Sequence, residues 1–415
     1  MITEYAGLFS NRKFLYLWTS QILSQLTIQI MNFTLLILLF DRTGSTIATS
    51  FLWISYALPA IFIGPFAAAS IDVTDKRKVL IITNFLQSLL IFLYALVQHT
   101  SVFLLYGIAI LYSLLNQFYV PAELSSLPTL IKKEFLSQAN GLFFITQQAA
   151  LIIGFGIASP FYTYLGFKNT LLICSMLLLL ASVSTVFLPR MIVIERQTKL
   201  LEKNLLAFVK KILEGYELIR ENRNVLAPFL LLMSLQIALA IAVVNAPVIA
   251  TAIFGIPINL IGLFLIVPAG VGSAIGAFII PRLLRKNVRK IKLIQNFLFV
   301  LSLVLFTLIF ILPNFPQPQR LVIGMITLIL SGISFVGVFI PSQTFLQEKT
   351  PGGFRGRVFG NYWFLVTIAT VFPVIFSGTI TELFGIKILL FILAIGLASL
   401  FVFIRNRGEA FLSSI

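Results

Sequence analysis

Residues 64–84, GPFAAASIDVTDKRKVLIITN, match residues 276–296, GAFIIPRLLRKNVRKIKLIQN, without a gap. In each copy an apolar segment is followed by a basic cluster and then by a second apolar segment. The basic clusters are aligned as well, since Arg77 corresponds to Arg289. Internal repetition at this distance indicates that the chain is built from two related halves.

The repeated segments lie within a series of apolar stretches that are long enough to cross a bilayer. Of the 415 residues 59% are apolar and 11% are charged, and the mean hydropathy is +1.02, which excludes a soluble globular domain. A transmembrane helix needs about 20 residues, whereas barrel strands are about ten residues long and alternate in polarity. We therefore predict an all-α membrane protein with twelve transmembrane helices, at residues 14–40, 46–71, 79–97, 102–122, 138–165, 170–188, 225–254, 258–280, 291–312, 321–346, 358–379 and 386–403.

The twelve predicted helices form two pseudo-symmetric halves of six. A second pair of matching phrases supports this division, because Pro121 in YVPAELSSLPTL corresponds to Pro341 in FIPSQTFLQEKT. Six crossings return the chain to its starting side, so the halves share one orientation about an axis along the membrane normal. We expect a cavity between two bundles. The expected parts are an N-terminal bundle at 1–189, a cytoplasmic amphipathic linker at 190–224 and a C-terminal bundle at 225–415.

The placement of the basic residues predicts the orientation in the membrane. The net charge is +16, and 26 of the 30 Lys and Arg fall on one side when the predicted spans alternate. Only Arg42, Lys168, Arg320 and Lys387 fall on the other side. Cytoplasmic loops carry such an excess. We therefore predict a multi-pass protein of the cell membrane with both termini in the cytoplasm, and no binding of nucleic acid.

The linker at 190–224 is the only long polar stretch. Its apolar residues recur at helical spacing, and its charged residues occupy other faces. This pattern predicts a helix that lies on the membrane surface in contact with membrane lipids, with a dedicated partner site as the alternative.

The sequence contains no recognisable catalytic, metal-binding or nucleotide-binding constellation. The single histidine, His99, is isolated, and the single cysteine, Cys174, lies inside a predicted span. A glycine-rich phosphate loop with its lysine is also missing, so ATP-driven transport is not encoded here. We expect neither enzyme activity nor a cofactor. Any uphill movement of a solute would then depend on an ion gradient.

Uncharged amides inside the spans predict a substrate cavity, because polar groups in hydrocarbon usually face a protein interior or water. Span one is the richest, since Gln21, Gln25, Gln29 and Asn32 recur at intervals of four, four and three residues along one helical face. The further candidates are Asn116, Gln117, Gln147, Gln148, Gln236, Asn245 and Gln343. Interhelical hydrogen bonding is the alternative role of any single amide.

The loop between spans two and three resembles the signature of the major facilitator superfamily, in which an aspartate precedes a basic cluster. Asp72 stands for that aspartate, and Asp75, Lys76, Arg77 and Lys78 form the acidic-basic run. Such a carboxylate can pair with a basic side chain or with the start of a helix. We predict that these residues form a gate and that Asp72 stabilises the conformation closed towards the cytoplasm. Fixing the topology is the alternative role of the three basic residues.

Other phrases resemble the bacterial macrolide-efflux and siderophore-exporter branch of the same superfamily. They are DRTGS at 41–45, PAELSSLPTLI at 121–131, EGYELIRENRNVL at 214–226 and TPGGFRGRVFG at 350–360. The resemblance implies a secondary active transporter, a monomer and antiporter that exports an amphipathic drug-like or macrolide-like molecule by alternating access. Because VPAELSSLPTL also resembles bacterial lysophospholipid transporters, a lipid substrate is the second hypothesis. A non-transporting membrane receptor or scaffold is the third.

Proton coupling would require a carboxylate in or beside a span, and few are available. Glu123, near the cytoplasmic end of span four, is the first candidate. Asp41, beside Arg42 at the outer end of span one, is the second. The alternative for Glu123 is an ion pair with Lys132 or Lys133.

Overall fold

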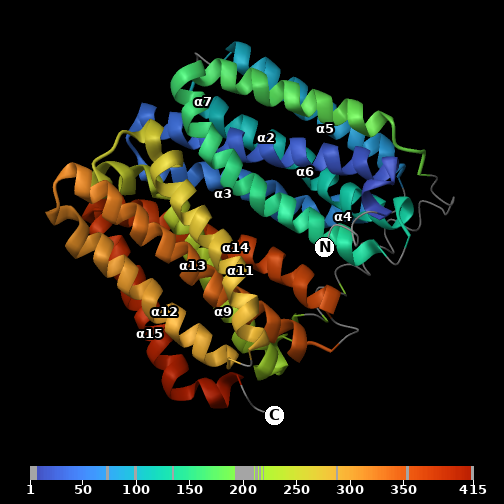
Figure 1. Cartoon of the computed structure of the whole chain (residues 1–415). Coiled ribbons are helices and arrows are strands. Elements are labelled where there is room, and N and C mark those ends of the chain that lie inside the picture. The colour runs from blue at the N-terminus through green and yellow to red at the C-terminus, as the bar shows by residue number, and fades with distance from the viewer. Residues whose placement is uncertain are drawn as a thin grey trace. The chain divides into compact units, whose positions relative to one another are not determined.

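The computed structural model of the chain is helical throughout its described residues (Figure 1). These are residues 7–71, 74–97, 101–132, 135–191, 210, 214, 216–217, 219–286, 288–351 and 355–412. No strand occurs among them. The prediction of an all-α membrane protein is confirmed.

The first six predicted spans correspond to six helices of unequal length. They are α2 (Arg12–Thr43), α3 (Thr46–Phe62), α4 (Gly64–Ile71), α5 (Lys76–Val97), α6 (Phe103–Leu130) and α7 (Leu136–Val186). Predicted span two is divided into α3 and α4 at Ile63, because Pro65 cannot donate a backbone hydrogen bond and its ring crowds the preceding turn. Predicted spans five and six are joined in α7, which changes direction at Gly166, where φ is 76°.

The second six spans contain more interruptions. Span seven comprises α9 (Arg223–Val244), α10 (Ala246–Val248) and the π-helix η2 (Ile249–Phe254), and span eight comprises η3 (Ile258–Leu260), η4 (Gly262–Ile266) and α11 (Val267–Arg285). The remaining spans are α12 (Lys290–Phe306) with η5 (Thr307–Ile311) and η6 (Leu312–Asn314), α13 (Gln317–Lys349), α14 (Arg355–Phe384) and α15 (Ile386–Leu412).

The helix lengths agree with twelve crossings. Among the described residues, ten helices are long and apolar enough to cross a membrane. One of these is α7, which supplies two crossings on either side of Gly166. The shorter apolar helix α3, continued by α4, supplies the twelfth.

The chain packs as two compact units. The first comprises Met1–Leu39 and Ile54–Phe208, and the second comprises Phe40–Trp53 and Val209–Ile415. The end of α2 and the first half of α3 therefore pack with the second unit, although most of both helices belongs to the first. The linker predicted at 190–224 lies mostly outside the described residues.

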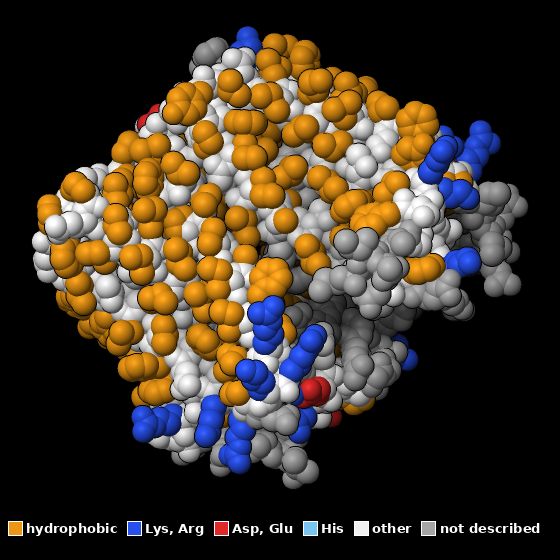
Figure 2. Space-filling model, in the orientation of Figure 1, with side chains coloured by type: hydrophobic (Ala, Val, Ile, Leu, Met, Phe, Trp, Pro, Cys, Tyr) orange, Lys and Arg blue, Asp and Glu red, His pale blue; other side chains and the backbone are white. Residues whose placement is uncertain are grey.

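Each unit has its own buried apolar core and small residues where helices approach closely. The first unit buries Phe14, Leu17 and Phe143 in one cluster. In the second unit a Cβ atom added to Gly272 would lie 2.0 Å from the carbonyl oxygen of Ile329, so α11 and α13 are in backbone contact there. Outside these cores, hydrophobic side chains cover much of the surface shown in Figure 2, and lysines and arginines gather in a few places. This is the distribution expected of helices facing lipid.

Candidate functional site

The amide stripe of α2 lies partly against α7. Gln21 is 3% exposed and donates from Nε2 to the carbonyl oxygen of Phe143 at 3.1 Å. Its Oε1 atom has no hydrogen-bond partner in the described part of the chain. Gln25, Gln29 and Asn32 are half-buried. The alternative role of interhelical bonding thus applies to Gln21, whereas the other three retain exposed surface.

A glycine of α7 positions one member of this stripe. A Cβ atom added to Gly154 would lie 2.6 Å from Cβ of Gln29. Because Gly154 has no side chain, α7 can approach α2 closely at this point. This close approach determines how far Gln29 is buried between the two helices. Further along α7, Gln147 and Gln148 are both exposed.

The amides of α6 join that helix to its neighbours within the first unit. Asn116 donates to the hydroxyl of Tyr56 on α3 at 3.3 Å. Gln117 donates to the carbonyl oxygen of Ser113 at 3.2 Å, and its Oε1 atom lies against Gly64 of α4. These two candidates are adjacent in the sequence, and their described hydrogen bonds are to other side chains and backbone groups of the first unit.

The amides of the second unit are more widely spread. Asn245, which is fully buried after the end of α9, donates to Ser377 Oγ at 3.0 Å and accepts from Thr381 Oγ1 at 2.8 Å. Its side chain therefore bonds α14. Gln236 on α9 and Gln343 on α13 are half-buried. The hydrogen bonds of the described residues do not link these three amides.

Residues 45–50 form a polar junction with α14 inside the second unit. The carboxylate of Glu382 accepts from Ser45 Oγ and, at 2.9 Å, from the backbone N–H of Ile47. Thr46 Oγ1 donates to the carbonyl oxygen of Gly378 at 2.8 Å. A carboxylate at the start of α3 complements the positive end of the helix dipole. Sequence analysis missed this junction because its partners are more than 300 residues apart.

Glu123 belongs to a buried polar network in the first unit. Its Oε1 atom accepts from the hydroxyl of Tyr119 at 2.7 Å, and that hydroxyl lies 3.3 Å from Ser20 Oγ on α2. Asn84 on α5 donates to Ser20 Oγ at 3.0 Å and accepts from Ser24 Oγ at 3.1 Å. The network thus connects three helices. Glu123 was predicted from the sequence as a proton-coupling residue, and Tyr119 stands four residues before it, on the same helix face.

The predicted alternative partners of Glu123 are Lys132 and Lys133. Lys132 is exposed at the end of α6, and Lys133 lies outside the described residues. The described hydrogen-bond partner of Glu123 is Tyr119 rather than a lysine. Asp41 is exposed near the C-terminal end of α2.

The predicted gating loop is described except for Asp72, which lies outside the described residues together with His99. Asp75 accepts from the backbone N–H of Arg77 at 3.1 Å and caps the start of α5. Lys76 donates from Nζ to the carbonyl oxygen of Ser125 on α6 at 3.0 Å. This contact ties the start of α5 to the end of α6.

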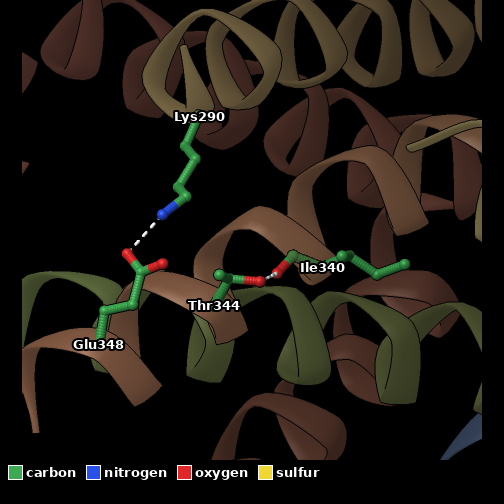
Figure 3. Close-up of polar contacts among 4 residues, drawn as sticks. All are labelled: Lys290, Ile340, Thr344 and Glu348. Atoms are coloured by element: carbon green, nitrogen blue, oxygen red, sulfur yellow. Dashed lines mark hydrogen bonds and ion pairs between the residues drawn. The ribbon is translucent and has the colours of Figure 1, made fainter. Parts of the chain in front are cut away.

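The other basic residues of the loop make different contacts. Arg77 donates to the carbonyl oxygen of Val186 at the end of α7, and Lys78 is exposed. In the second unit, Lys290 at the start of α12 pairs with Glu348 near the end of α13 (Figure 3). One turn before Glu348, Thr344 donates to the carbonyl oxygen of Ile340 at 2.9 Å (Figure 3).

Apolar helices of membrane-spanning length, two compact units and polar side chains within their helix packing define a multi-pass α-helical membrane protein. A family model described as Major Facilitator Superfamily matches residues 17–373. The chain therefore belongs to the Major Facilitator Superfamily and is a transporter. The family resemblance inferred from the loop signature is confirmed.

Curated relatives match nearly the whole chain. An uncharacterised MFS-type transporter of Bacillus subtilis, YfiS, is 24% identical over 388 residues, which cover 92% of this chain and 90% of the relative. Macrolide efflux protein A of Streptococcus pyogenes is 23% identical over 382 residues, which cover 90% of this chain and 91% of the relative. The efflux branch predicted from short loop phrases is thus found among the relatives.

Solved structures support the fold. The POT family transporter PepTSo superposes with a TM-score of 0.72 at 12% identity and covers 98% of this chain and 99% of its own. At this identity the likeness concerns the fold alone.

Proposed function

We propose that this protein is a secondary active exporter of amphipathic, macrolide-like small molecules. It works by alternating access in the cell membrane, with both termini in the cytoplasm. The likeness to macrolide efflux protein A over 90% of the chain supports this class of substrate. The bias of basic residues supports the orientation.

The observation that carries the proposal is the amide stripe on α2. Gln25, Gln29 and Asn32 are half-buried and carry no charge. Amide groups donate and accept hydrogen bonds without attracting either sign of charge. A path lined by such groups suits a neutral or weakly polar amphiphile better than a highly charged metabolite.

The junction at residues 45–50 supports alternating access. The chain leaves the first unit within α2, after Leu39, and returns to it within α3, at Ile54. Between these points, the hydrogen bonds to Gly378 and Glu382 hold it to the second unit. By the predicted topology this junction lies on the outer side, and a change of conformation there would require a few hydrogen bonds to break and reform. Asp72 and the basic run of residues 76–78 would serve the cytoplasmic side.

Accumulation of a macrolide in bacteria that lack their own drug exporters tests the proposal. Expression of the protein should lower the steady-state amount of erythromycin in the cells, and Gln25→Leu should restore it by removing the amide while keeping the volume. Ile28→Leu, at a half-buried neighbour on the same helix, is the matched control and should export normally. Unchanged erythromycin accumulation, together with flipping of labelled lysophospholipid by the reconstituted protein, would overturn the macrolide class in favour of a lipid. No movement of either probe would overturn transport of both classes.

A further inference from the structure

The first unit buries the carboxyl group of Glu123, which has no basic partner among the described residues. Glu123 is 3% exposed, and its described partner, Tyr119, is 1% exposed. Ionised side chains inside membrane proteins almost always pair with an opposite charge or face a water-filled cavity. A carboxyl group buried against a neutral hydroxyl is better suited to carrying a proton than to forming a permanent ion pair.

The described groups near Glu123 lie on α6, α2, α5 and α7. Tyr119 is the titratable neighbour on α6 itself, and α2 contributes the uncharged Ser20. From α5 the network receives the uncharged Asn84, while Lys76 at the start of that helix donates to the carbonyl oxygen of Ser125. On α7, the residues that share this core include the apolar Ala139 and Phe143. In the described part of the chain, no Lys, Arg or His is thus seen to neutralise the carboxylate.

The hydrogen-bond chain can satisfy both protonation states of the carboxyl group. Asn84 Nδ2 is a fixed donor to Ser20 Oγ, so the serine hydroxyl is free to donate to Tyr119 Oη and the tyrosine hydroxyl to Glu123. In this order Asn84 donates to Ser20, Ser20 donates to Tyr119, and Tyr119 donates to the ionised carboxylate of Glu123. Each hydrogen bond in such a chain polarises and strengthens the next. When Glu123 is protonated it can donate to Tyr119 instead, because a hydroxyl accepts as well as donates.

We propose that Glu123, Tyr119 and Ser20 form a proton-binding site in the first unit, with Asn84 as its fixed donor. In uptake, a hydronium ion gives its proton to a carboxylate oxygen of Glu123 and leaves as water. In release, the same O–H bond breaks and a water molecule takes the proton. The proton exchanged here is the ion that moves inward as substrate moves outward. This last step rests on the proposed export function, whereas proton binding at Glu123 does not.

Infrared difference spectroscopy of the full-length protein in lipid nanodiscs tests the site without any substrate. The C=O stretching band of a protonated carboxyl group should be present at neutral pH and should be lost in Glu123→Gln. Glu348→Gln, which removes an exposed carboxylate, is the matched control and should keep the band. Tyr119→Phe keeps the ring and removes the hydroxyl, so it should shift both the frequency of the band and the pH at which it disappears. A neutral-pH spectrum that is the same in the wild type and Glu123→Gln would overturn the site.

Transport by proteoliposomes then tests the coupling. With a pH gradient, wild-type protein should accumulate erythromycin, whereas Glu123→Gln should lose this accumulation and keep the exchange of labelled for unlabelled erythromycin. The retained exchange shows that the variant is folded. Gradient-driven accumulation by Glu123→Gln would overturn the coupling. If the wild type moves no erythromycin, the proposed substrate fails, while the infrared result still decides the proton site.

Discussion

The start of α5 and the start of α12 are related by the internal repeat, and a lysine ties each of them to the following helix by different chemistry. In the first unit, Lys76 donates to the carbonyl oxygen of Ser125 at 3.0 Å. In the second unit, Lys290 pairs with Glu348 and also lies 5.1 Å from the ring centre of Phe345. Ser125 and Phe345 are equivalent positions in the second pair of repeated phrases. Lys290 corresponds to Lys78 rather than to Lys76 in the repeat. The same helix ends therefore meet in each unit, but through different residues.

This difference shows how a repeated backbone can carry two kinds of contact. Where the second unit has Glu348, the first has Pro128, so the first unit has no carboxylate at that position. Where the first unit has Asp72, the second has Leu284. A repeat thus fixes which helix ends meet, whereas single substitutions decide whether the junction holds a charge pair. We predict that the loops before α5 and α12, which the predicted topology places in the cytoplasm, contribute unequally to gating.

The largest expected effect comes from removing Asp72, an acid of the first copy that the second copy lacks. Asp72→Asn should lower erythromycin export tenfold or more, because loss of a charge-assisted contact shifts a two-state balance by about 1.5–3 kcal/mol. Export should be measured together with the amount of protein in the membrane. Arg285→Gln removes an exposed charge from the second copy and should export normally. Normal export by well-folded Asp72→Asn would show that the two loops do not differ in gating.

The repeated glycines should show a second, smaller asymmetry. A Cβ atom at Gly276 would lie 3.2 Å from the backbone of Ile333, whereas at Gly64 it would lie 3.3 Å from Oε1 of Gln117. A side-chain end can move, but the backbone of a packed helix cannot move as easily. Gly276→Ala should therefore destabilise the protein by about 1–3 kcal/mol, the usual cost of overpacking, and Gly64→Ala should cost less. Thermal unfolding in detergent measures both, and equal losses would contradict the asymmetry.

The architecture could be predicted because bilayer thickness turns the length of an apolar run into a crossing. That rule identified the all-helical class and the apolar spans, but it does not describe breaks within a run. The interruption at Ile63 depends on Pro65, whereas the turn at Gly166 within α7 lies between the predicted spans 138–165 and 170–188. The packing of residues 40–53 with the second unit could not be predicted from the sequence either, because it depends on contacts with α9 and α14.

The candidate site was predictable only in part, because a local pattern shows which residues are polar but not what they touch. Glu123 stood out as an acid in an apolar helix, and the structure adds its partners on α2 and α5. Asn245 stood out as an amide, yet its bonds to α14 come from the particular way in which the helices pack. Side chains from distant segments meet according to helix rotation and crossing, which periodicity leaves undetermined.

The smallest expected effect separates the two lysine junctions by their response to salt. The Lys290–Glu348 pair is 25% and 52% exposed, so it should contribute at most about 1 kcal/mol and weaken as salt screens it. The bond from Lys76 to Ser125 is partly buried and should contribute about 1 kcal/mol with little dependence on salt. Lys76→Met and Glu348→Gln should therefore lower the unfolding temperature by similar amounts at low salt. At high salt only Lys76→Met should remain below the wild type. If high salt removes both differences, Lys76 acts as a surface charge and the proposed asymmetry between the two junctions is wrong.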